Sequence, residues 1–191
     1  MLNIALFGPP GSGKGTQSKF IIDKYSLTYI STGDILREHI SRQTTLGLQA
    51  KQIIDQGHLV PDELVVKLIE EKLNNAAKTN GFLFDGFPRT CPQAKILEQI
   101  LAARRLNLNA MVSLEVPQAE LVQRLLDRAK VQGRSDDTKE VIEARFKEYA
   151  SKTMPVIDFY KALNKYHPVN GVGTLDEVFV RIQQVLDAFE K

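Results

Sequence analysis

The sequence contains a single cysteine and no long apolar run, and these absences exclude several classes of protein. Cys91 alone cannot form an internal disulfide or a zinc site of several cysteines, and we expect a small buried side chain there. No apolar segment approaches the ~20 residues that span a membrane, and no pattern typical of a secretory signal precedes the first strand. The 25 Lys and Arg barely exceed the 23 Asp and Glu, which argues against a general nucleic-acid binder. We expect a cytoplasmic protein that binds neither membranes nor nucleic acid.

Several catalytic motifs are also missing. The histidines His39, His58 and His167 are scattered without the spacing of metal ligands. The nucleophile motif G-x-S-x-G is absent, and so is the Asn-Lys-x-Asp segment with which GTPases recognise guanine. A metallohydrolase or an acyl-transfer enzyme would therefore lack essential residues.

What the sequence does contain is a glycine-rich loop, Gly8–Thr16, between a short apolar run and a helical pattern. This context is typical of a phosphate-binding loop, because glycines bring successive N–H groups close to an anion and the helix N-terminus adds a positive dipole. Lys14 adds a full positive charge. The pattern G-x-x-x-x-G-K-[ST] is met with one defect, since Gly15 follows the lysine and the hydroxyl comes one residue late, at Thr16.

Two other interpretations of this loop stay open. A glycine-rich turn without a ligand is one, although such a turn has no need of four glycines and a lysine. A dinucleotide-binding fingerprint is the other, although its third glycine would stand where Thr16 does.

Short apolar runs alternate along the chain with helical patterns. The runs that predict strands are Asn3–Phe7, Thr28–Ile30, Phe82–Phe84, Met111–Leu114 and His167–Asn170. The helical patterns cover Gly15–Tyr25, Asp34–Arg42, Leu46–Gln56, Pro61–Lys78, Pro92–Arg104, Pro117–Asp127, Thr138–Asn164 and Thr174–Phe189. This alternation in 191 residues predicts one α/β domain with a five-stranded parallel sheet and helices on both faces. Pro155 should kink or break its helical stretch at Met154.

Polar segments follow three of the predicted strands, and ligands bind beyond the carboxyl ends of such strands. Asp85 ends one strand, where it could orient Mg²⁺ or simply begin a turn. Arg89 follows four residues later in a Gly-Phe-Pro-Arg turn, and it is suited to binding a second phosphate with two hydrogen bonds. Arg37 lies one helical turn beyond Ser31–Asp34, where the alternative is an ordinary surface arginine.

A second basic cluster comes later in the chain, at Arg124, Arg128, Arg134 and Arg145. A solvated helix face is the simpler explanation of Arg124. The loop Gly133–Asp137 suggests a hinged flap that covers a ligand and excludes water, which would protect an activated phosphoryl group from hydrolysis. Transfer from one phosphate to another fits this inventory, because an anionic acceptor oxygen needs no general base.

Together these segments resemble the adenylate kinase family over nearly the full length of the chain. The similar segments are Gly8–Gln17, Ser31–Arg37, Gly57–Pro61, Asp85–Ala94, Arg124–Arg128 and Gly133–Asp137, with Arg145. The Gly-Thr after Lys14 is a mark of this family, so the defect in the loop favours the resemblance. The resemblance implies a P-loop NTPase-type fold with a mobile NMP-binding insertion at 31–60, a short lid at 128–137, and a core at 1–30, 61–127 and 138–191.

The resemblance also implies a role for each matching residue. ATP would be held by Gly11, Ser12, Gly13, Lys14, Gly15, Thr16, Arg128 and Gly173, with Arg128 stacked on its adenine. AMP would be held by Thr32, Arg37, Leu59, Val60, Gly86, Arg89, Gln93, Arg134 and Arg145. The catalytic residues would be Lys14, Arg89, Arg124, Arg134 and Arg145, and Asp85 would orient Mg²⁺ through water.

The implied reaction is the reversible, Mg²⁺-dependent transfer of a phosphoryl group from ATP to AMP, giving two ADP. Only seven residues separate Arg128 from Asp136, so the lid resembles the short form, and we expect no structural zinc and a monomer. Thr32 and Gln93 favour AMP, since relatives acting on UMP and CMP tend to carry Ala and Asn there. A UMP/CMP kinase and a catalytically inactive nucleotide-binding protein are the alternatives.

Overall fold

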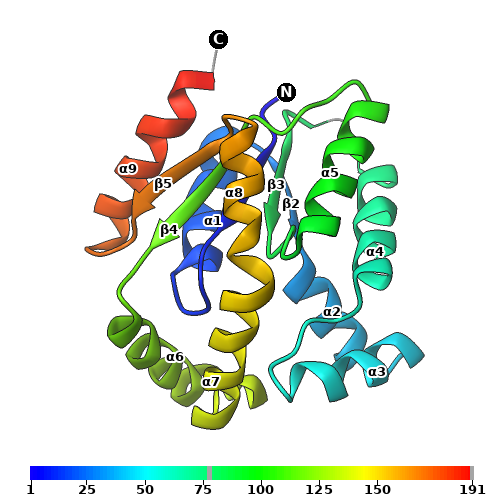
Figure 1. The fold of residues 1–191 in the computed structure, drawn as a ribbon, viewed down its shortest axis with the longest axis vertical. Coiled ribbons are helices and arrows are strands. Elements are labelled where there is room, and N and C mark those ends of the chain that lie inside the picture. The colour runs from blue at the N-terminus through cyan, green and yellow to red at the C-terminus, as the bar shows by residue number, and fades with distance from the viewer. Residues whose placement is uncertain (77–78, 190–191) are drawn as a thin grey trace.

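A computed structural model describes residues 1–76 and 79–189 and contains a central parallel β-sheet (Figure 1). The strands are β1 Ile4–Phe7, β2 Thr28–Ser31, β3 Phe82–Asp85, β4 Ala110–Glu115 and β5 Tyr166–Asn170. Their order across the five-stranded sheet is β2-β3-β1-β4-β5, with every neighbouring pair parallel. The predicted sheet and all five predicted strands are confirmed.

Helices connect the strands. They are α1 Lys14–Tyr25, α2 Thr32–Ser41, α3 Thr45–Ile54, α4 Asp62–Asn74, α5 Cys91–Ala103, α6 Gln118–Gln132, α7 Lys139–Glu148, α8 Pro155–Ala162 and α9 Leu175–Leu186. Short 3-10 turns lie at Ser135–Asp137 and Asp187–Phe189. Hydroxyl side chains cap several N-termini; those that accept a hydrogen bond from the first turn are Ser31, Thr44, Thr90, Thr138 and Thr174.

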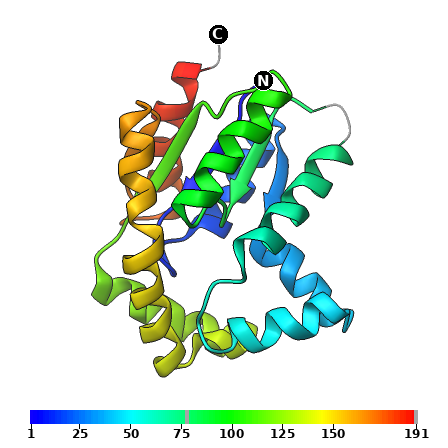
Figure 2. The ribbon, with the colours of Figure 1, turned by 45° about the vertical axis from the view of Figure 1, so that its right-hand side comes forward.

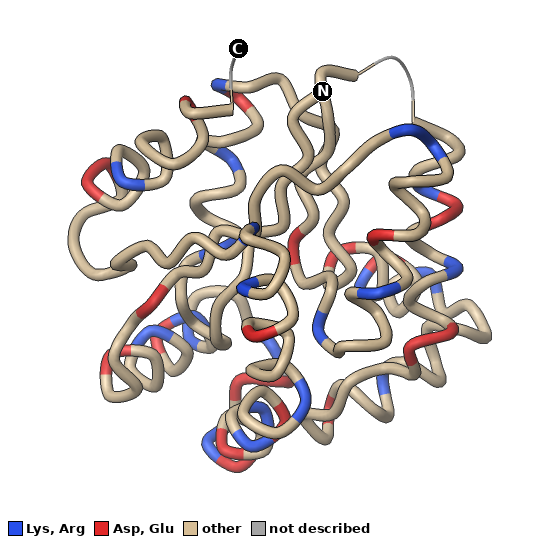
Figure 3. The backbone as a smooth tube through the Cα atoms, turned by 45° about the horizontal axis from the view of Figure 1, so that its top comes forward, with Lys and Arg blue, Asp and Glu red and all other residues tan. Residues whose placement is uncertain are grey.

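The sheet has a helical layer on each face, and the two-residue period of β1 supplies both. Ile4 and Leu6 belong to the core beneath α1 and α9, whereas Ala5 and Phe7 belong to the core beneath α4, α5 and α8. Figure 2 shows this layering, and Figure 3 shows that the charged residues lie mainly on the helices and loops around mostly uncharged strands. Apolar strands sandwiched in this way confirm the prediction of helices on both faces.

Most helix boundaries lie within three residues of those predicted, and three helical stretches differ by more. Helix α6 continues to Gln132 instead of ending at Asp127, and Gly133 ends it with a φ of 59°. Helix α4 ends at Asn74; the predicted end at Lys78 lies outside the described residues. The stretch predicted at Thr138–Asn164 is interrupted as expected, but from Tyr149 onward.

This interruption is a π-helical turn at Tyr149–Thr153, which precedes Pro155 at the first position of α8. The N–H of Met154 donates to the carbonyl of Tyr149, five residues back, at 2.8 Å. The wider turn accommodates a proline, which has no N–H to donate. Within the described ranges no helix is both long and apolar enough to cross a membrane.

Two pairs of helices extend from the carboxyl edge of the sheet. Helices α2 and α3 leave it on one side, and α6 and α7 leave it on the other (Figures 1 and 2). Because β1, β2 and β3 are adjacent and parallel, the segments that follow them meet between these two pairs.

Candidate functional site

The loop between β1 and α1 has the backbone of an anion cradle. Gly13 caps α1 with a φ of 94°, a conformation that residues with a side chain rarely adopt. A Cβ atom on Gly11 would lie 2.9 Å from the carbonyl oxygen of Leu121, so the loop packs closely under α6. The N–H groups at the start of α1 and its helix dipole therefore point toward the space above the loop.

Lys14 reaches back over this loop. Its Nζ donates to the carbonyl of Gly8 at 2.8 Å and to that of Pro9 at 3.0 Å. Burial lowers the pKa of the Lys14 amine to about 8, although the carboxylate of Asp85 acts in the opposite direction. The lysine thus stands between the phosphate loop and an acid on the neighbouring strand.

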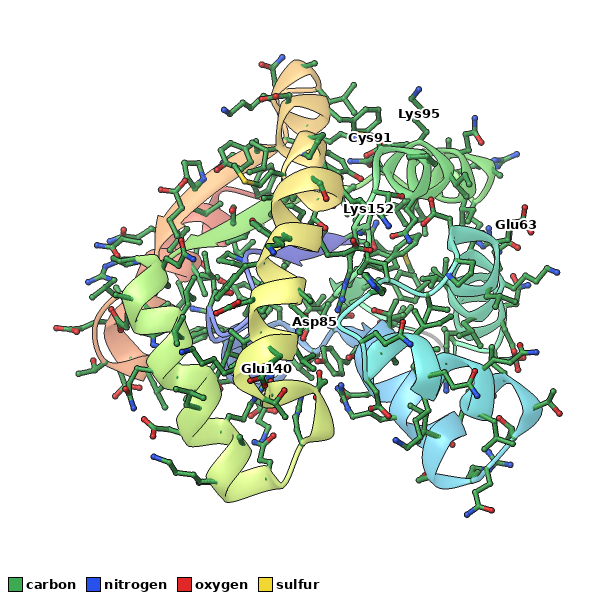
Figure 4. All side chains as sticks on the ribbon, turned by 60° about the horizontal axis from the view of Figure 1, so that its bottom comes forward. Glu63, Asp85, Cys91, Lys95, Glu140 and Lys152 are labelled. Carbon is green, nitrogen blue, oxygen red and sulfur yellow. The ribbon has the colours of Figure 1, made fainter. Side chains whose placement is uncertain are left out.

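Asp85 ends β3 beside β1 and β2, where it pairs in register with Leu6 and Ser31. Its side chain lies at the centre of the site (Figure 4). The hydroxyl of Tyr29 donates to Asp85 Oδ2 at 2.8 Å, and burial together with this negative charge raises the pKa of Tyr29. Tyr29 is not among the predicted site residues, because this contact depends on the packing of β2 against β3.

The turn after β3 joins the segment after β2 through one carbonyl oxygen. Arg89 Nε donates to the carbonyl of Gly86 at 2.8 Å, and the hydroxyl of Thr32 donates to the same oxygen at 2.9 Å. Burial lowers the pKa of Arg89 to about 10, aided by the positive charge of Arg145. Arg89 therefore remains charged at neutral pH and is held ready for an anion.

The acids of the 3-10 turn after α6 bind two of the predicted arginines. Arg128 donates two hydrogen bonds to the buried carboxylate of Asp137, each at 2.7 Å. Arg145 donates to Asp137 at 2.8 Å and to Asp136 at 3.0 Å. Burial lowers the pKa of Arg145. Asp137 thus ties the end of α6 to α7.

The other three predicted arginines have looser surroundings. Arg124 pairs with Glu120 on its own helix and donates to the carbonyl of Gly171 at 3.2 Å. Arg134 Nε donates to the side chain of Gln132 at 2.9 Å. Arg37 pairs with Asp34, and its side chain is 44% exposed. This exposure is compatible with a surface arginine, but the side chain also lines the site.

Two clefts open at the carboxyl edge of the sheet. The first, which we call the loop cleft, has a volume of about 1070 Å³, room for a whole nucleotide. The predicted site residues that line it are Gly11, Ser12, Gly13, Lys14, Gly15, Thr16, Arg37, Asp85, Arg89, Arg124, Arg128, Arg134, Arg145 and Gly173. The second, the inner cleft, lies toward α2 and α4; its predicted residues are Lys14, Thr32, Arg37, Leu59, Val60, Gly86, Arg89, Gln93 and Arg145.

Every predicted site residue lines one of these clefts, and four cations line both. These four, Lys14, Arg37, Arg89 and Arg145, stand where the clefts adjoin. Arg134, predicted for AMP, lines the loop cleft and not the inner one. Cys91 is half-buried at the start of α5 and packs against the core.

Two residues that support the inner cleft, Asp62 and Glu148, are not among the predicted site residues. Glu148 accepts a hydrogen bond from the N–H of Leu59 at 3.1 Å, and the amide of Gln93 donates to Asp62 at 2.7 Å. A capping signal, Thr90-x-x-Gln93, was available for part of this arrangement. In the described part of the chain, no group of three or more His, Cys, Asp and Glu could hold a metal ion.

Comparisons with known proteins agree with this geometry. A family model described as adenylate kinase matches residues 6–165. A protein named adenylate kinase from Porphyromonas gingivalis strain W83 is 47% identical over all 191 residues, which cover 98% of that protein. Proteins of the same name from Bacteroides thetaiotaomicron and Flavobacterium psychrophilum are 48% and 47% identical, each over 98% of this chain and 99% of their own length.

Proposed function

This chain belongs to the adenylate kinase family, and we propose that it transfers the terminal phosphoryl group of ATP to AMP, reversibly, giving two ADP. One observation carries the proposal: two clefts adjoin at four shared cations, Lys14, Arg37, Arg89 and Arg145. Two nucleotides whose phosphates met there would be positioned for transfer between them. One cleft carries a phosphate loop, and the other is lined by apolar side chains and an amide that suit a base.

The donor ATP would lie in the loop cleft. The N–H groups from Gly11 to Thr16 and the amine of Lys14 would bind its phosphates. Arg128 would stack on the adenine while its guanidinium remains bonded to Asp137, because the flat face of a guanidinium stays available for stacking. Gly173 lines the same cleft and supports the donor position.

The acceptor AMP would lie in the inner cleft. Arg37 and Arg89 would bind its phosphate, and both are present at the junction of the clefts. Leu59 and Val60 would pack against the base, with Thr32, Gly86 and Gln93 around it. Arg134 and Arg145 would complete the phosphate contacts, Arg134 reaching AMP from the loop cleft.

The transfer needs no general base. The bond between the terminal phosphorus of ATP and its bridging oxygen breaks, and a bond forms from that phosphorus to an oxygen of the AMP phosphate. That oxygen is already anionic at neutral pH, so positioning and charge neutralisation suffice. Lys14, Arg89, Arg124, Arg134 and Arg145 would neutralise the charge that develops on the transferred group.

The residues of this site suit a magnesium ion that binds together with a nucleotide. Asp85 is largely buried beside the phosphate loop, and one of its oxygens accepts from Tyr29. Mg²⁺ commonly binds one or two carboxylates plus water and substrate phosphates, and does not require an all-protein cage. Asp85 would hold the ion through water, and the ion would supply positive charge to the donor phosphates.

Two segments would close over the substrates. We propose residues 31–60 as the mobile NMP-binding insertion and 128–137 as a short lid without structural zinc, around a core of 1–30, 61–127 and 138–191. Closure would exclude water from the phosphoryl group. We also propose a cytoplasmic monomer, which light scattering after gel filtration would test; a dimer would contradict it.

Two other functions compete with this proposal. A UMP/CMP kinase would share the fold, but Thr32 and Gln93 favour adenine. An inactive nucleotide-binding protein would be expected to have lost Lys14 or a lid arginine, and the sequence retains all of them.

A coupled assay with ATP against AMP, GMP, CMP and UMP separates these alternatives. We expect the largest kcat/KM for AMP. An equal or larger value for CMP or UMP would overturn the acceptor assignment, whereas tight ATP binding without turnover would support the inactive protein.

A further inference from the structure

We propose that Asp62 is a specificity-determining residue that fixes the orientation of the Gln93 side-chain amide in the inner cleft. The inference rests on the proposed function, because it assumes that Gln93 meets the acceptor base. Asp62 begins α4, and Gln93 lies in the first turn of α5. Asp62 does not itself line the cleft, so it would act through Gln93 as a positioning residue.

The amide of Gln93 has a defined partner on each side. Its Nε2 donates to Asp62 Oδ1 at 2.7 Å, and its Oε1 accepts from the backbone N–H of Arg89 at 2.7 Å. The hydroxyl of Thr90 donates to the second oxygen of Asp62 at 2.8 Å and so fixes the carboxylate. Gln93 is only 2% exposed, so bulk water does not replace these bonds.

These partners make the two orientations of the amide unequal. A carboxylate can only accept, and a backbone N–H can only donate. Turning the amide over would place its oxygen against the Asp62 carboxylate and its NH₂ group against the N–H of Arg89. Both contacts would then be repulsive, and two buried hydrogen bonds would be lost. The observed orientation is therefore strongly preferred while Asp62 is present.

Half of the hydrogen-bonding capacity of this amide remains for a ligand. A glutamine amide has two N–H groups and two oxygen lone pairs. Asp62 occupies one N–H and Arg89 occupies one lone pair. One donor and one acceptor remain on a side chain that lines the inner cleft, in an order set by the protein.

This fixed order distinguishes two classes of purine. Adenine presents an acceptor at N1 and a donor at its 6-amino group. A 6-oxopurine such as hypoxanthine presents the reverse, a donor at N1 and an acceptor at O6. In the same base pose, one amide orientation matches adenine and the other matches hypoxanthine. By holding one orientation, Asp62 would discriminate against 6-oxopurine monophosphates.

A simpler role for Asp62 is to stabilise α4, because acids favour the first turn of a helix. Glu63 is the next acid in that same turn, and it is exposed and directed away from the core (Figure 4). Glu63→Ala therefore removes an equivalent helix charge without touching Gln93. It is the matched control for the structural role.

The test measures kcat/KM for AMP and for IMP, at saturating ATP, in the wild type and in the variants Asp62→Ala, Asp62→Asn and Glu63→Ala. Asp62→Ala should lower the AMP-to-IMP ratio by roughly 3- to 10-fold, the worth of one hydrogen bond, mainly through a higher KM for AMP. Asp62→Asn should recover only part of the ratio, because its amide can turn either its oxygen or its NH₂ group toward Gln93. Glu63→Ala should leave the ratio unchanged.

An unchanged ratio in Asp62→Ala, or an equal loss in Glu63→Ala, would overturn the inference. Thermal unfolding of each variant is measured first; if Asp62→Ala does not fold, Asp62→Ser takes its place, since serine suits a helix start but is too short to hold Gln93. A wild type without AMP kinase activity would refute the proposed function itself. That outcome is distinct from an active enzyme whose AMP-to-IMP ratio stays the same when Asp62 is replaced.

Discussion

The carboxylate of Glu148 accepts a hydrogen bond from the backbone N–H of Leu59 at 3.1 Å, joining segments 89 residues apart in the sequence. Lys152 donates to the same carboxylate at 2.7 Å, and His58 lies 3.7 Å from its other oxygen. Leu59 lines the inner cleft. The end of α7 thus holds in place the backbone against which the acceptor base would pack.

We expect Glu148→Ala to raise the KM for AMP by roughly 3- to 10-fold, because one hydrogen bond that positions Leu59 is lost. The KM for ATP should change little, since Glu148 does not line the loop cleft. Steady-state kinetics with each substrate varied in turn provide the measurement. An equal rise in both KM values would refute a local effect on the inner cleft.

The same carboxylate predicts a pH dependence of stability. Burial opposes its ionisation, but the bonds from Lys152 and Leu59 outweigh this and lower the pKa of Glu148 below its ordinary 4.5. The carboxylate therefore stabilises the fold above pH 4.5, and its contribution is lost as the pH falls through the lowered pKa. The difference in melting temperature between the wild type and Glu148→Gln should shrink on acidification; a difference that stays constant would contradict this assignment.

Asp137 should be a major contributor to stability. Its fully buried side chain bonds both Arg128 and Arg145. Asp137→Ala therefore removes the carboxylate partner of Arg128 and leaves Arg145 paired with Asp136 alone. We expect a loss of about 3 kcal/mol in the free energy of unfolding, measured with urea. Asp127→Ala, which removes an exposed acid paired with Lys130, is the control and should cost less than about 1 kcal/mol. Similar losses of unfolding free energy in both variants would show that burial of the Asp137 ion pairs adds nothing to stability.

Arg89→Ala should mainly impair the use of AMP. The variant removes a charge-assisted phosphate contact worth about 2–3 kcal/mol, which corresponds to a fall of roughly 30- to 150-fold in kcat/KM for AMP. Arg42→Ala is the control, because Arg42 is an exposed arginine of the same segment as Arg37 and pairs with Glu38 at the surface. Unchanged KM and kcat for AMP in Arg89→Ala would remove this residue from the acceptor site.

The pKa of Lys14 predicts a decline in activity at alkaline pH. Burial lowers this pKa to about 8, so the free enzyme loses the positive charge for the donor phosphates as the pH rises through that value. kcat/KM for ATP should fall accordingly, while kcat should fall only at higher pH, because bound phosphates favour the protonated amine. Cys91→Ala removes the one cysteine of the sequence and should leave the profile intact. A flat profile between about pH 7 and 9.5 would contradict the assignment.

Patterns in the sequence predicted much of this molecule. The strand-loop-helix context placed Gly8–Thr16 correctly, and the rule that ligands bind at strand ends brought Asp85 and Arg89 to one edge of the sheet. These features are local or follow from a parallel sheet. The roles of the site residues stay predictions, although all of these residues line the two clefts.

The residues that support the site could not be predicted in the same way. Tyr29, Asp62 and Glu148 act through contacts with Asp85, Gln93 and Leu59, which lie 56, 31 and 89 residues away in the sequence. No periodicity or short motif encodes such packing. The true end of α6, in contrast, was available from Gly133, since a glycine just past a helical pattern is a common stop signal.

The central claim is that phosphate passes between two nucleotides at the junction of the clefts. Its most direct test is the ADP yield of purified enzyme given Mg²⁺, ATP and limiting AMP, with a parallel reaction from which AMP is omitted. We expect two ADP for each AMP consumed and no ADP without AMP. ADP formed from ATP alone, or no ADP in either reaction, would contradict it.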